Sequence, residues 1–408
     1  MMRKISVALI HYSAPPVVGG VEAVLARHAD LMAQAGHAVR VVAGRGEQWQ
    51  PRVGFHRLPL IDSRHARVLA AKHELDQGRL PQDFAPLTAE IADGLTPALD
   101  GADVIIAHNV CSLHKNLALT ATLRQIHTEA ADQRLILWHH DLAWTTPRYR
   151  AELHDGYPWD LLRRDWGAEH VAVSGARQTE LADLMGIPVD AIRVIPNGIA
   201  SEAFFKLELQ TQSLMERFNL GQAAPLLLLP VRVTRRKNIE LALRVAAELK
   251  AEFPDTMLVV TGPPGPHNPA NQEYFVHLQQ LRATLGLERA AVFLAEAVEA
   301  FLPDAVIADL YRLADVLLLP SREEGFGIPL LEAALSRMPV FCADIPPLRA
   351  LGGDEARYFD PDANPRDVAG ALAAFLVQDP AFLAASRARR QYDWKRIYTA
   401  QIAPLLER

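Results

Sequence analysis

Short continuous runs of apolar residues alternate along the chain with segments whose apolar residues recur at helical spacing. A continuous apolar run suits a strand covered on both faces in a parallel sheet, and the helical spacing indicates an amphipathic helix. The alternation is typical of a doubly wound α/β sheet. The strands predicted in the first half are Ile5–Ile10, Val39–Ala43, one near Phe55, Val104–Ala107, Leu135–Trp138, His170–Ser174 and one within 192–198.

A second set of apolar runs follows a polar stretch at 206–212, which we interpret as part of a linker. A chain of 408 residues is too long for one ordinary domain, so two α/β domains are expected. We interpret residues 11–18 as a loop and expect the first helix to lie after the glycine pair Gly19 and Gly20. The strands predicted in the second half are Leu226–Leu229, Met257–Thr261, Val292–Leu294, one opening at Val316, and Val340–Ala343.

The stretch from 315 to 332 reads as a buried strand, a glycine loop and the start of a helix. Two glycines in the loop 324–327 remove side-chain bulk, so backbone N–H groups can approach a ligand. Pro329 is predicted as the first helical residue, which places Glu332 in the first turn. Two carboxylates, free N–H groups and the positive end of a helix together suit a polyhydroxylated anion.

Composition limits what this site can belong to. The net charge of −6 argues against nucleic acid as the main partner. The two cysteines, Cys111 and Cys342, lie far apart, which fits a reducing cytoplasm. The N-terminal apolar run is too short for a signal core, and no run of apolar residues is long enough for a transmembrane helix. We therefore expect a folded cytoplasmic enzyme.

The segment E-G-F-G-I-P-L-L-E, with seven residues between Glu324 and Glu332, resembles the paired-glutamate signature of the family-4 retaining glycosyltransferases of GT-B fold. Other segments resemble that family and fall in its order along nearly the whole chain. These are Gly19-Gly20 before a helix, A-G-H-A-V-R-V-V at Ala35–Val42, His140-Asp141, V-I-P-N-G-I at Val194–Ile199, the pair Arg232 and Lys237, and A-D-V-L-L-L-P-S at Ala314–Ser321.

The resemblance implies two Rossmann-like domains that face each other across a cleft. Residues 1–199, completed by the C-terminal helix 392–408, would bind the acceptor, and residues 200–391 would bind the donor. The implied reaction is retaining transfer of a hexose from a nucleotide sugar, UDP-glucose or GDP-mannose, to a hydroxyl of a small soluble sugar or sugar acid. No metal or other cofactor is required, and a lipid-linked or cell-envelope glycan stays open as an alternative acceptor.

The resemblance also assigns residues to the reaction. A catalytic set of His140, Arg232, Lys237 and Glu324 is implied, in which Arg232 and Lys237 bind the diphosphate as a planar fork and a point charge. Glu324 and His140 would contact the transferred sugar, and Glu332 the ribose. The implied donor-binding residues are Gly19, Gly20, Arg232, Lys237, Gly262, Glu324, Gly325, Phe326, Gly327, Ile328, Leu330 and Glu332, and the acceptor-binding candidates are Tyr12, Asp141, Trp144 and Tyr149.

Other interpretations of these residues stand beside this one. Arg235 and Arg236 suit a solvated basic turn, and Trp144 and Tyr149 suit an ordinary core as well as a sugar-stacking surface. The adjacent histidines His139 and His140 could indicate a zinc site, although neighbouring residues on a strand point to opposite faces of the sheet. A nucleotide-sugar epimerase or hydrolase on the same fold, and a non-catalytic nucleotide-sugar-binding protein, remain the alternative functions.

Overall fold

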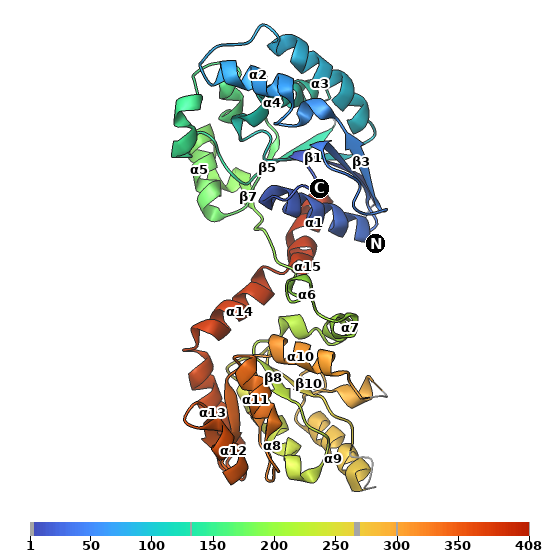
Figure 1. The fold of residues 1–408 in the computed structure, drawn as a ribbon, viewed down its shortest axis with the longest axis vertical. Coiled ribbons are helices and arrows are strands. Elements are labelled where there is room, and N and C mark those ends of the chain that lie inside the picture. The colour runs from blue at the N-terminus through green and yellow to red at the C-terminus, as the bar shows by residue number, and fades with distance from the viewer. Residues whose placement is uncertain (1–3, 131–132, 265–269, 299–300, 408) are drawn as a thin grey trace. The chain divides into compact units, whose positions relative to one another are not determined.

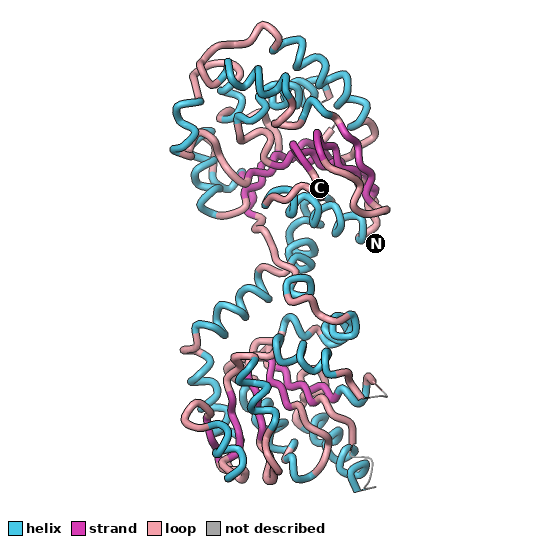
Figure 2. The backbone as a smooth tube through the Cα atoms, in the orientation of Figure 1, coloured by secondary structure: helices cyan, strands magenta, loops and turns pink. Residues whose placement is uncertain are grey.

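The computed structural model describes residues 4–130, 133–264, 270–298 and 301–407. The chain divides into two compact units, residues 1–198 with 394–408 and residues 199–393. Each unit holds one parallel sheet with helices on both of its faces (Figures 1 and 2). The predicted fold class, α/β with doubly wound Rossmann-like domains, is confirmed.

The first unit contains a seven-stranded sheet in the order β3-β2-β1-β4-β5-β6-β7, and its strand pairs are parallel. The order reverses between β1 and β4, so the connections after these two strands diverge and leave a crevice at their carboxyl ends. We call this position the first switch point. The strands are β1 (Ser6–Ser13), β2 (Ala38–Arg45), β3 (Val53–Arg57), β4 (Val104–His108), β5 (Arg134–His139), β6 (Glu169–Ala172) and β7 (Ile192–Val194).

Two helices of the first unit, α4 and α5, begin at a side chain that accepts from a free N–H group, whereas α1, α2 and α3 have no side-chain cap. The Asn116 side chain accepts from the Leu119 N–H at the start of α4, and the Ser174 side chain accepts from the Arg177 N–H at the start of α5. The helices are α1 (Gly20–Gln34), α2 (Ala66–Leu75), α3 (Phe84–Leu99), α4 (Leu117–Glu129) and α5 (Gly175–Met185).

The C-terminal segment returns to the first unit. It consists of α15 (Trp394–Ile397), a π-helical turn (Tyr398–Ile402) and α16 (Ala403–Leu406). Arg134 donates to the carbonyls of Leu405 at 3.1 Å and Leu406 at 3.3 Å, which lie at the C-terminal end of the segment, where a cation is favourable. The Trp394 ring lies 5.3 Å from the His28 ring of α1.

The second unit contains a six-stranded sheet in the order β10-β9-β8-β11-β12-β13, also paired in parallel. The order reverses between β8 and β11, which defines the second switch point. Both strands are buried throughout, as their continuous apolar sequences predict. The strands are β8 (Leu226–Leu229), β9 (Met257–Val260), β10 (Ala291–Phe293), β11 (Val316–Leu319), β12 (Val340–Ala343) and β13 (Arg357–Phe359).

Nine helices of the second unit lie in its described residues, and α14 is held to the sheet by a buried ion pair. Arg389 donates two hydrogen bonds of 2.8 Å to the Asp315 carboxylate, beside the start of β11.

No single described helix is long and apolar enough to cross a bilayer, and α13 and α14 pass that test only as a pair bent by 83°. The helices are α6 (Ser201–Phe204), α7 (Leu209–Phe218), α8 (Ile239–Leu249), α9 (Ala270–Thr284), α10 (Asp304–Leu313), α11 (Ile328–Leu335), α12 (Pro346–Gly352), α13 (Pro365–Leu376) and α14 (Pro380–Gln391).

Two local predictions are wrong. The first strand does not end at Ile10 but runs to Ser13, because His11 and Ser13 continue the parallel ladder against β2. The polar stretch 206–212 is not a simple linker, because it contains the start of α7. The Asp309 carboxylate on α10 fixes that start by accepting hydrogen bonds from the Glu208 N–H and the Thr211 hydroxyl.

Part of the predicted Pro/Gly-rich loop 262–269 lies outside the described residues, which end at Pro264 and resume at Ala270. The described part pairs with the loop after β8, since Val233 and Pro264 form an isolated parallel bridge. The loop after β9 therefore approaches the second switch point.

Candidate functional site

An ion pair lies at the second switch point, between the chain segments that leave β8 and β11. Lys237 Nζ is 2.5 Å from Glu324 Oε1, and the two side chains are 10% and 7% exposed. Lys237 ends the short 3-10 helix Arg235–Lys237, while Glu324 lies in the glycine loop. The two loops are also joined through their backbones, because the Arg322 N–H donates to the Arg236 carbonyl at 2.8 Å.

Two opposing effects act on the lysine. Burial lowers the pKa of Lys237, and the hydrogen bond that Lys237 donates to Glu324 opposes that shift by favouring the charged form. An incoming phosphate would compete with Glu324 for the same ammonium group. Arg236 lies 3.9 Å from Glu324 Oε2 and donates to the Glu323 carbonyl, so it binds the glycine loop instead of forming a merely solvated turn.

The glycine loop leads into α11 through a position that only glycine suits. Gly327 has φ +107°, and a Cβ there would lie 2.8 Å from Leu348 Cδ2. The helix begins at Ile328, so Pro329 is its second residue, and Glu332 lies in the second turn. The prediction that Pro329 opens the helix and Glu332 lies in the first turn was therefore wrong by one residue, because Gly327 turns the chain earlier.

Glu332 has a partner that the sequence analysis did not identify. The hydroxyl of Tyr311, on α10, donates to Glu332 Oε2 at 2.6 Å. Tyr311 is buried, and burial followed by this hydrogen bond raises its pKa, so the hydroxyl keeps its proton. The bond fixes one oxygen of Glu332 and leaves the other for a ligand.

The other candidates for the donor site differ in their exposure and in their contacts. Arg232 is exposed, with its guanidinium 5.5 Å from the centre of the Phe301 ring, and it forms no ion pair within the described residues. A Cβ on Gly262 would lie 2.4 Å from the Val231 carbonyl oxygen, so glycine allows the loops after β9 and β8 to touch. Phe326 and Ile328 are exposed, whereas Leu330 packs in the core and offers only its backbone.

The first switch point holds a cavity of about 340 Å³. Of the predicted residues, Gly20, Tyr12 and Asp141 line it, and Gly19 caps the neighbouring start of α1 without a side-chain hydrogen bond. Sequence reasoning missed most of the other lining residues, because they come from β1, α1, the end of β2 and the segments after Ile61 and β4, which lie far apart in the sequence. They are His11, Ser13, Val21, Glu22, Arg45, Ser63, Arg64, Asn109, Leu113 and Lys115.

The aromatic acceptor candidates differ in their surroundings. Tyr12 is buried, with its hydroxyl 3.4 Å from the carbonyls of Val110 and Leu113. Trp144 packs under the Arg163 guanidinium at 4.1 Å, and Tyr149 packs edge-on to His114 at 4.9 Å. Trp144 and Tyr149 pack against the core of the first unit and are not among the lining residues of this cavity.

His140 follows β5 at the first switch point. Its Nε2 lies 3.3 Å from His108 Nδ1, and its backbone N–H donates to the Asn109 side chain. Burial lowers the pKa of His140 to about 4, so the ring is neutral at pH 7. His139 instead lies 3.0 Å from His170 Nδ1 in the interior of the same unit, so the adjacent histidines do not converge on one metal.

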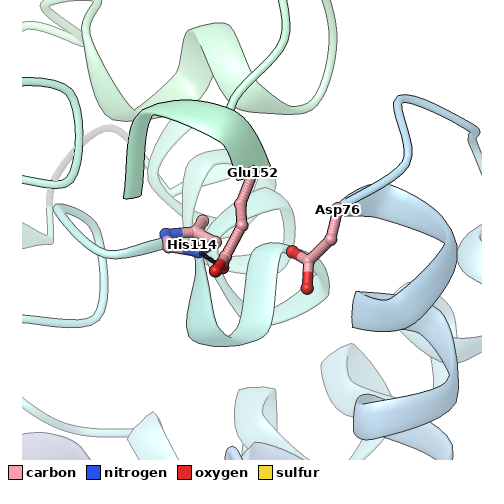
Figure 3. Close-up of side chains that lie close together, drawn as sticks. All are labelled: Asp76, His114 and Glu152. Atoms are coloured by element: carbon pink, nitrogen blue, oxygen red, sulfur yellow. Dashed lines mark hydrogen bonds and ion pairs between the residues drawn. The ribbon is translucent and has the colours of Figure 1, made fainter. Parts of the chain in front are cut away.

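Asp76, His114 and Glu152 form the one described cluster with the spacing of a metal site (Figure 3). Lys72 already bridges it, with its Nζ 2.6 Å from Asp76 and 2.8 Å from Glu152. Hydrogen bonds from Lys72 and His114 hold the pKa of Glu152 below its usual value. The ammonium supplies the positive charge that a metal would bring, so we interpret the cluster as an ion-pair clamp.

Family comparisons cover both units. Residues 18–203 match the model of Glycosyltransferase Family 4, and residues 211–392 match that of Glycosyl transferases group 1. A D-inositol 3-phosphate glycosyltransferase from Streptosporangium roseum is 27% identical over 369 residues, which are 88% of this chain and 80% of that protein.

A mannosylglucosylglycerate synthase from Thermotoga maritima is 23% identical over 360 residues, covering 82% of this chain and 79% of that protein. The solved sucrose-phosphate synthase of Thermosynechococcus elongatus aligns with 99% of this chain and 98% of its own, at 17% identity and a TM-score of 0.40, a likeness too weak to support a functional argument. The two family models together span both Rossmann-like units and their switch points, and the chain belongs to the family-4 glycosyltransferases.

Proposed function

We propose that the protein is a retaining hexosyltransferase that takes its sugar from UDP-glucose or GDP-mannose and transfers it to a hydroxyl of a small sugar or sugar acid. The observation that carries the donor half is the buried pair of Lys237 and Glu324 at the second switch point. Ligands of open α/β sheets bind at such a position, outside the carboxyl ends of the strands.

The departing diphosphate requires positively charged or hydrogen-bond-donating groups in the site. When the bond between the anomeric carbon and the phosphate oxygen breaks, negative charge grows on the phosphate while the sugar becomes oxocarbenium-like. Lys237 and the exposed Arg232 are the cations that meet this charge in the proposal. The N–H groups at the start of α11 add neutral donors and the positive end of a helix.

The sugar and the nucleoside are held by carboxylates in this proposal. Glu324 exchanges part of its contact with Lys237 for a hydroxyl of the transferred hexose, and Glu332, held by Tyr311, accepts from the ribose hydroxyls. His140, neutral at pH 7, acts as a hydrogen-bond partner of the hexose and not as a cation.

Retention follows from same-face attack. The acceptor oxygen bonds to the anomeric carbon on the face that the diphosphate leaves, and its proton passes to the departing phosphate oxygen. Atoms and charge balance without a covalent enzyme intermediate, a metal or another cofactor.

The choice of a small acceptor rests on the relatives. Their names specify D-inositol 3-phosphate in one case and the product mannosylglucosylglycerate in the other, and both are polyhydroxylated molecules that carry an acidic group.

The test is a transfer assay on the purified full chain. UDP-glucose and GDP-mannose are each supplied with and without a panel of neutral, phosphorylated and carboxylated sugars, and products are identified by mass and by the NMR coupling of the new anomeric proton. We expect transfer that requires an acceptor and keeps the donor's anomeric configuration. Donor consumption without any acceptor dependence would instead support a hydrolase or epimerase, and donor binding without turnover would support a non-catalytic protein.

A further inference from the structure

The cavity at the first switch point contains three cationic side chains, and one of them, Lys115, has no ion-pair partner among the described residues. Lys115, in the 3-10 turn after β4, is half-buried, and its ammonium forms no hydrogen bond or ion pair with any residue that the structure describes. Arg45, at the end of β2, has a buried Nε without a hydrogen-bond partner, and its nearest carboxylate oxygen, on Asp62, is 3.7 Å away. Arg64 supplies a third, exposed cation at the rim.

The carboxylates of the same cavity are partly committed. Glu22 Oε1 accepts from the Ser13 hydroxyl at 2.6 Å and lies 3.8 Å from His11 Nε2. Asp141 accepts from the Asn109 amide at 3.3 Å. Each carboxylate has a second oxygen to offer, and carboxylate oxygens accept hydrogen bonds from sugar hydroxyls.

Two neutral or positive groups lie in the cavity with Lys115, beside the carboxylates of Glu22 and Asp141. Burial lowers the pKa of His11 to about 4, so that ring adds no charge at pH 7. The first turn of α1, capped by Gly19 without a side-chain bond, points its positive end towards the same cavity, since Gly20 and Val21 line it.

We propose that this cavity binds the acceptor, and that the acceptor is a polyhydroxylated molecule bearing a phosphate or carboxylate group whose charge is met by Lys115, with Arg45 and Arg64 beside it. Glu22 and Asp141 receive its hydroxyls. A cavity of about 340 Å³ has room for a monosaccharide with one such group. The inference rests on the proposed function, because it names the class of the acceptor and the residues that select it.

Direct binding tests this assignment without relying on transfer. Glucose 6-phosphate, glucuronate and glucose are titrated by calorimetry into the full chain, in buffer containing UDP and GDP to fill the donor site of the second unit. We expect both anions to bind more tightly than glucose. Lys115→Ala should weaken the two anions by about tenfold and leave glucose within about twofold, because only the anions lose a charge-assisted partner.

Matched variants complete the experiment. Lys115→Arg should restore most of the preference for anions. Arg52→Ala should leave all three affinities unchanged, because it removes an exposed cation of the same unit that lies outside the cavity. Raising the salt concentration should narrow the difference in affinity between the anions and glucose in the wild type, and should narrow it less in Lys115→Ala, which keeps only Arg45 and Arg64.

Several results would overturn the proposal. These are equal affinity for glucose and the anions, no binding of any of the three, an unchanged anion preference in Lys115→Ala, or a loss of UDP and GDP affinity in that variant, which would assign the cavity to the donor diphosphate. Intact anion binding with no transfer from any donor would contradict the proposed function and leave the anion site standing.

Discussion

The two switch points have the same topology and opposite electrostatic arrangements. At the second, Lys237 is buried against Glu324 at 2.5 Å, so its charge is already neutralised. At the first, Lys115 is half-buried and has no ion-pair partner among the described residues. Repeating a Rossmann-like architecture therefore fixes where a ligand binds but not how its charge is met.

The difference has a consequence for each ligand. In the proposed reaction, a diphosphate at the second switch point competes with Glu324 for Lys237, and its negative charge increases as the bond between the anomeric carbon and the phosphate oxygen breaks. An anion at the first switch point meets a cation that is already available. We therefore expect Lys237 to affect turnover most strongly and Lys115 to affect binding.

The largest expected effect is the loss of turnover in Lys237→Ala. Removing a cation aimed at the leaving group should lower kcat by about 100-fold or more, in line with other electrostatic groups of this kind. Glu332→Ala should also lower turnover severely, through loss of the ribose contact that the proposed function assigns to Glu332. Steady-state kinetics measure both, with Arg244→Ala on the exposed face of α8 as the control. Near-normal kcat in both variants, with folding intact, would break the assignment of the second switch point.

The second-largest effect is expected from acid, which should lower the stability of the first unit and not that of the second. Burial lowers the pKa of His11 and His140 to about 4 and that of His28 to about 3. As pH falls below about 6.5, the unfolded chain takes up protons that the folded first unit refuses until its own pKa values are reached. Its stability should therefore fall by about 1.4 kcal/mol per pH unit for each such histidine.

The second unit is the internal control for this prediction, because its described residues include one histidine, the exposed His277. Hydrogen–deuterium exchange of the full chain at pH 7 and pH 5, corrected for intrinsic rates, should show protection lost in the first unit and kept in the second. Equal loss in both units would show that the buried histidines do not control the acid response.

A smaller effect is expected from Gly327→Ala. An alanine at φ +107° is strained, and its Cβ would meet Leu348 Cδ2 at 2.8 Å. The second unit should lose about 1 to 2 kcal/mol of unfolding free energy, measured by urea denaturation. Gly325→Ala is the matched control, since its Cβ would have no atom within 4 Å. If both variants are equally stable, the glycine requirement at the start of α11 is not the one described.

The smallest effect is expected from Tyr311→Phe. Losing the hydroxyl that fixes Glu332 should raise the KM of the nucleotide sugar by about fivefold, equivalent to roughly one hydrogen bond, with kcat little changed. Tyr398→Phe removes a buried hydroxyl that has no hydrogen-bond partner and serves as the control. A fall in kcat with unchanged donor KM would contradict a positioning role for Tyr311.

Much of this architecture could be predicted from local sequence. The bounds of β8 match the prediction and β11 begins at the predicted Val316, because an uninterrupted apolar run has one stable place in a parallel sheet. The first residues of α7 could not be predicted, because the Asp309 carboxylate that holds them lies on α10. Intrinsic helix propensity does not depend on such a tertiary hydrogen bond, so it could not indicate this helix start.

The site was predictable only in part, for the same reason. The motifs indicated Lys237 and Glu324 separately, whereas their direct pairing joins residues 87 positions apart. Lys115 and Arg45 carry no motif at all. They gain meaning from the strand order, which brings the loops after β1, β2 and β4 to one edge of the first sheet.

We propose that the two switch points hold different ligands, a nucleoside diphosphate at the second and an anionic acceptor at the first. The most direct test is calorimetric titration of UDP and GDP into the wild type, Lys237→Ala and Lys115→Ala. We predict that one nucleotide binds the wild type, that Lys237→Ala weakens this binding by about tenfold or more, and that Lys115→Ala leaves it within about twofold. Equal weakening by both variants would contradict the claim.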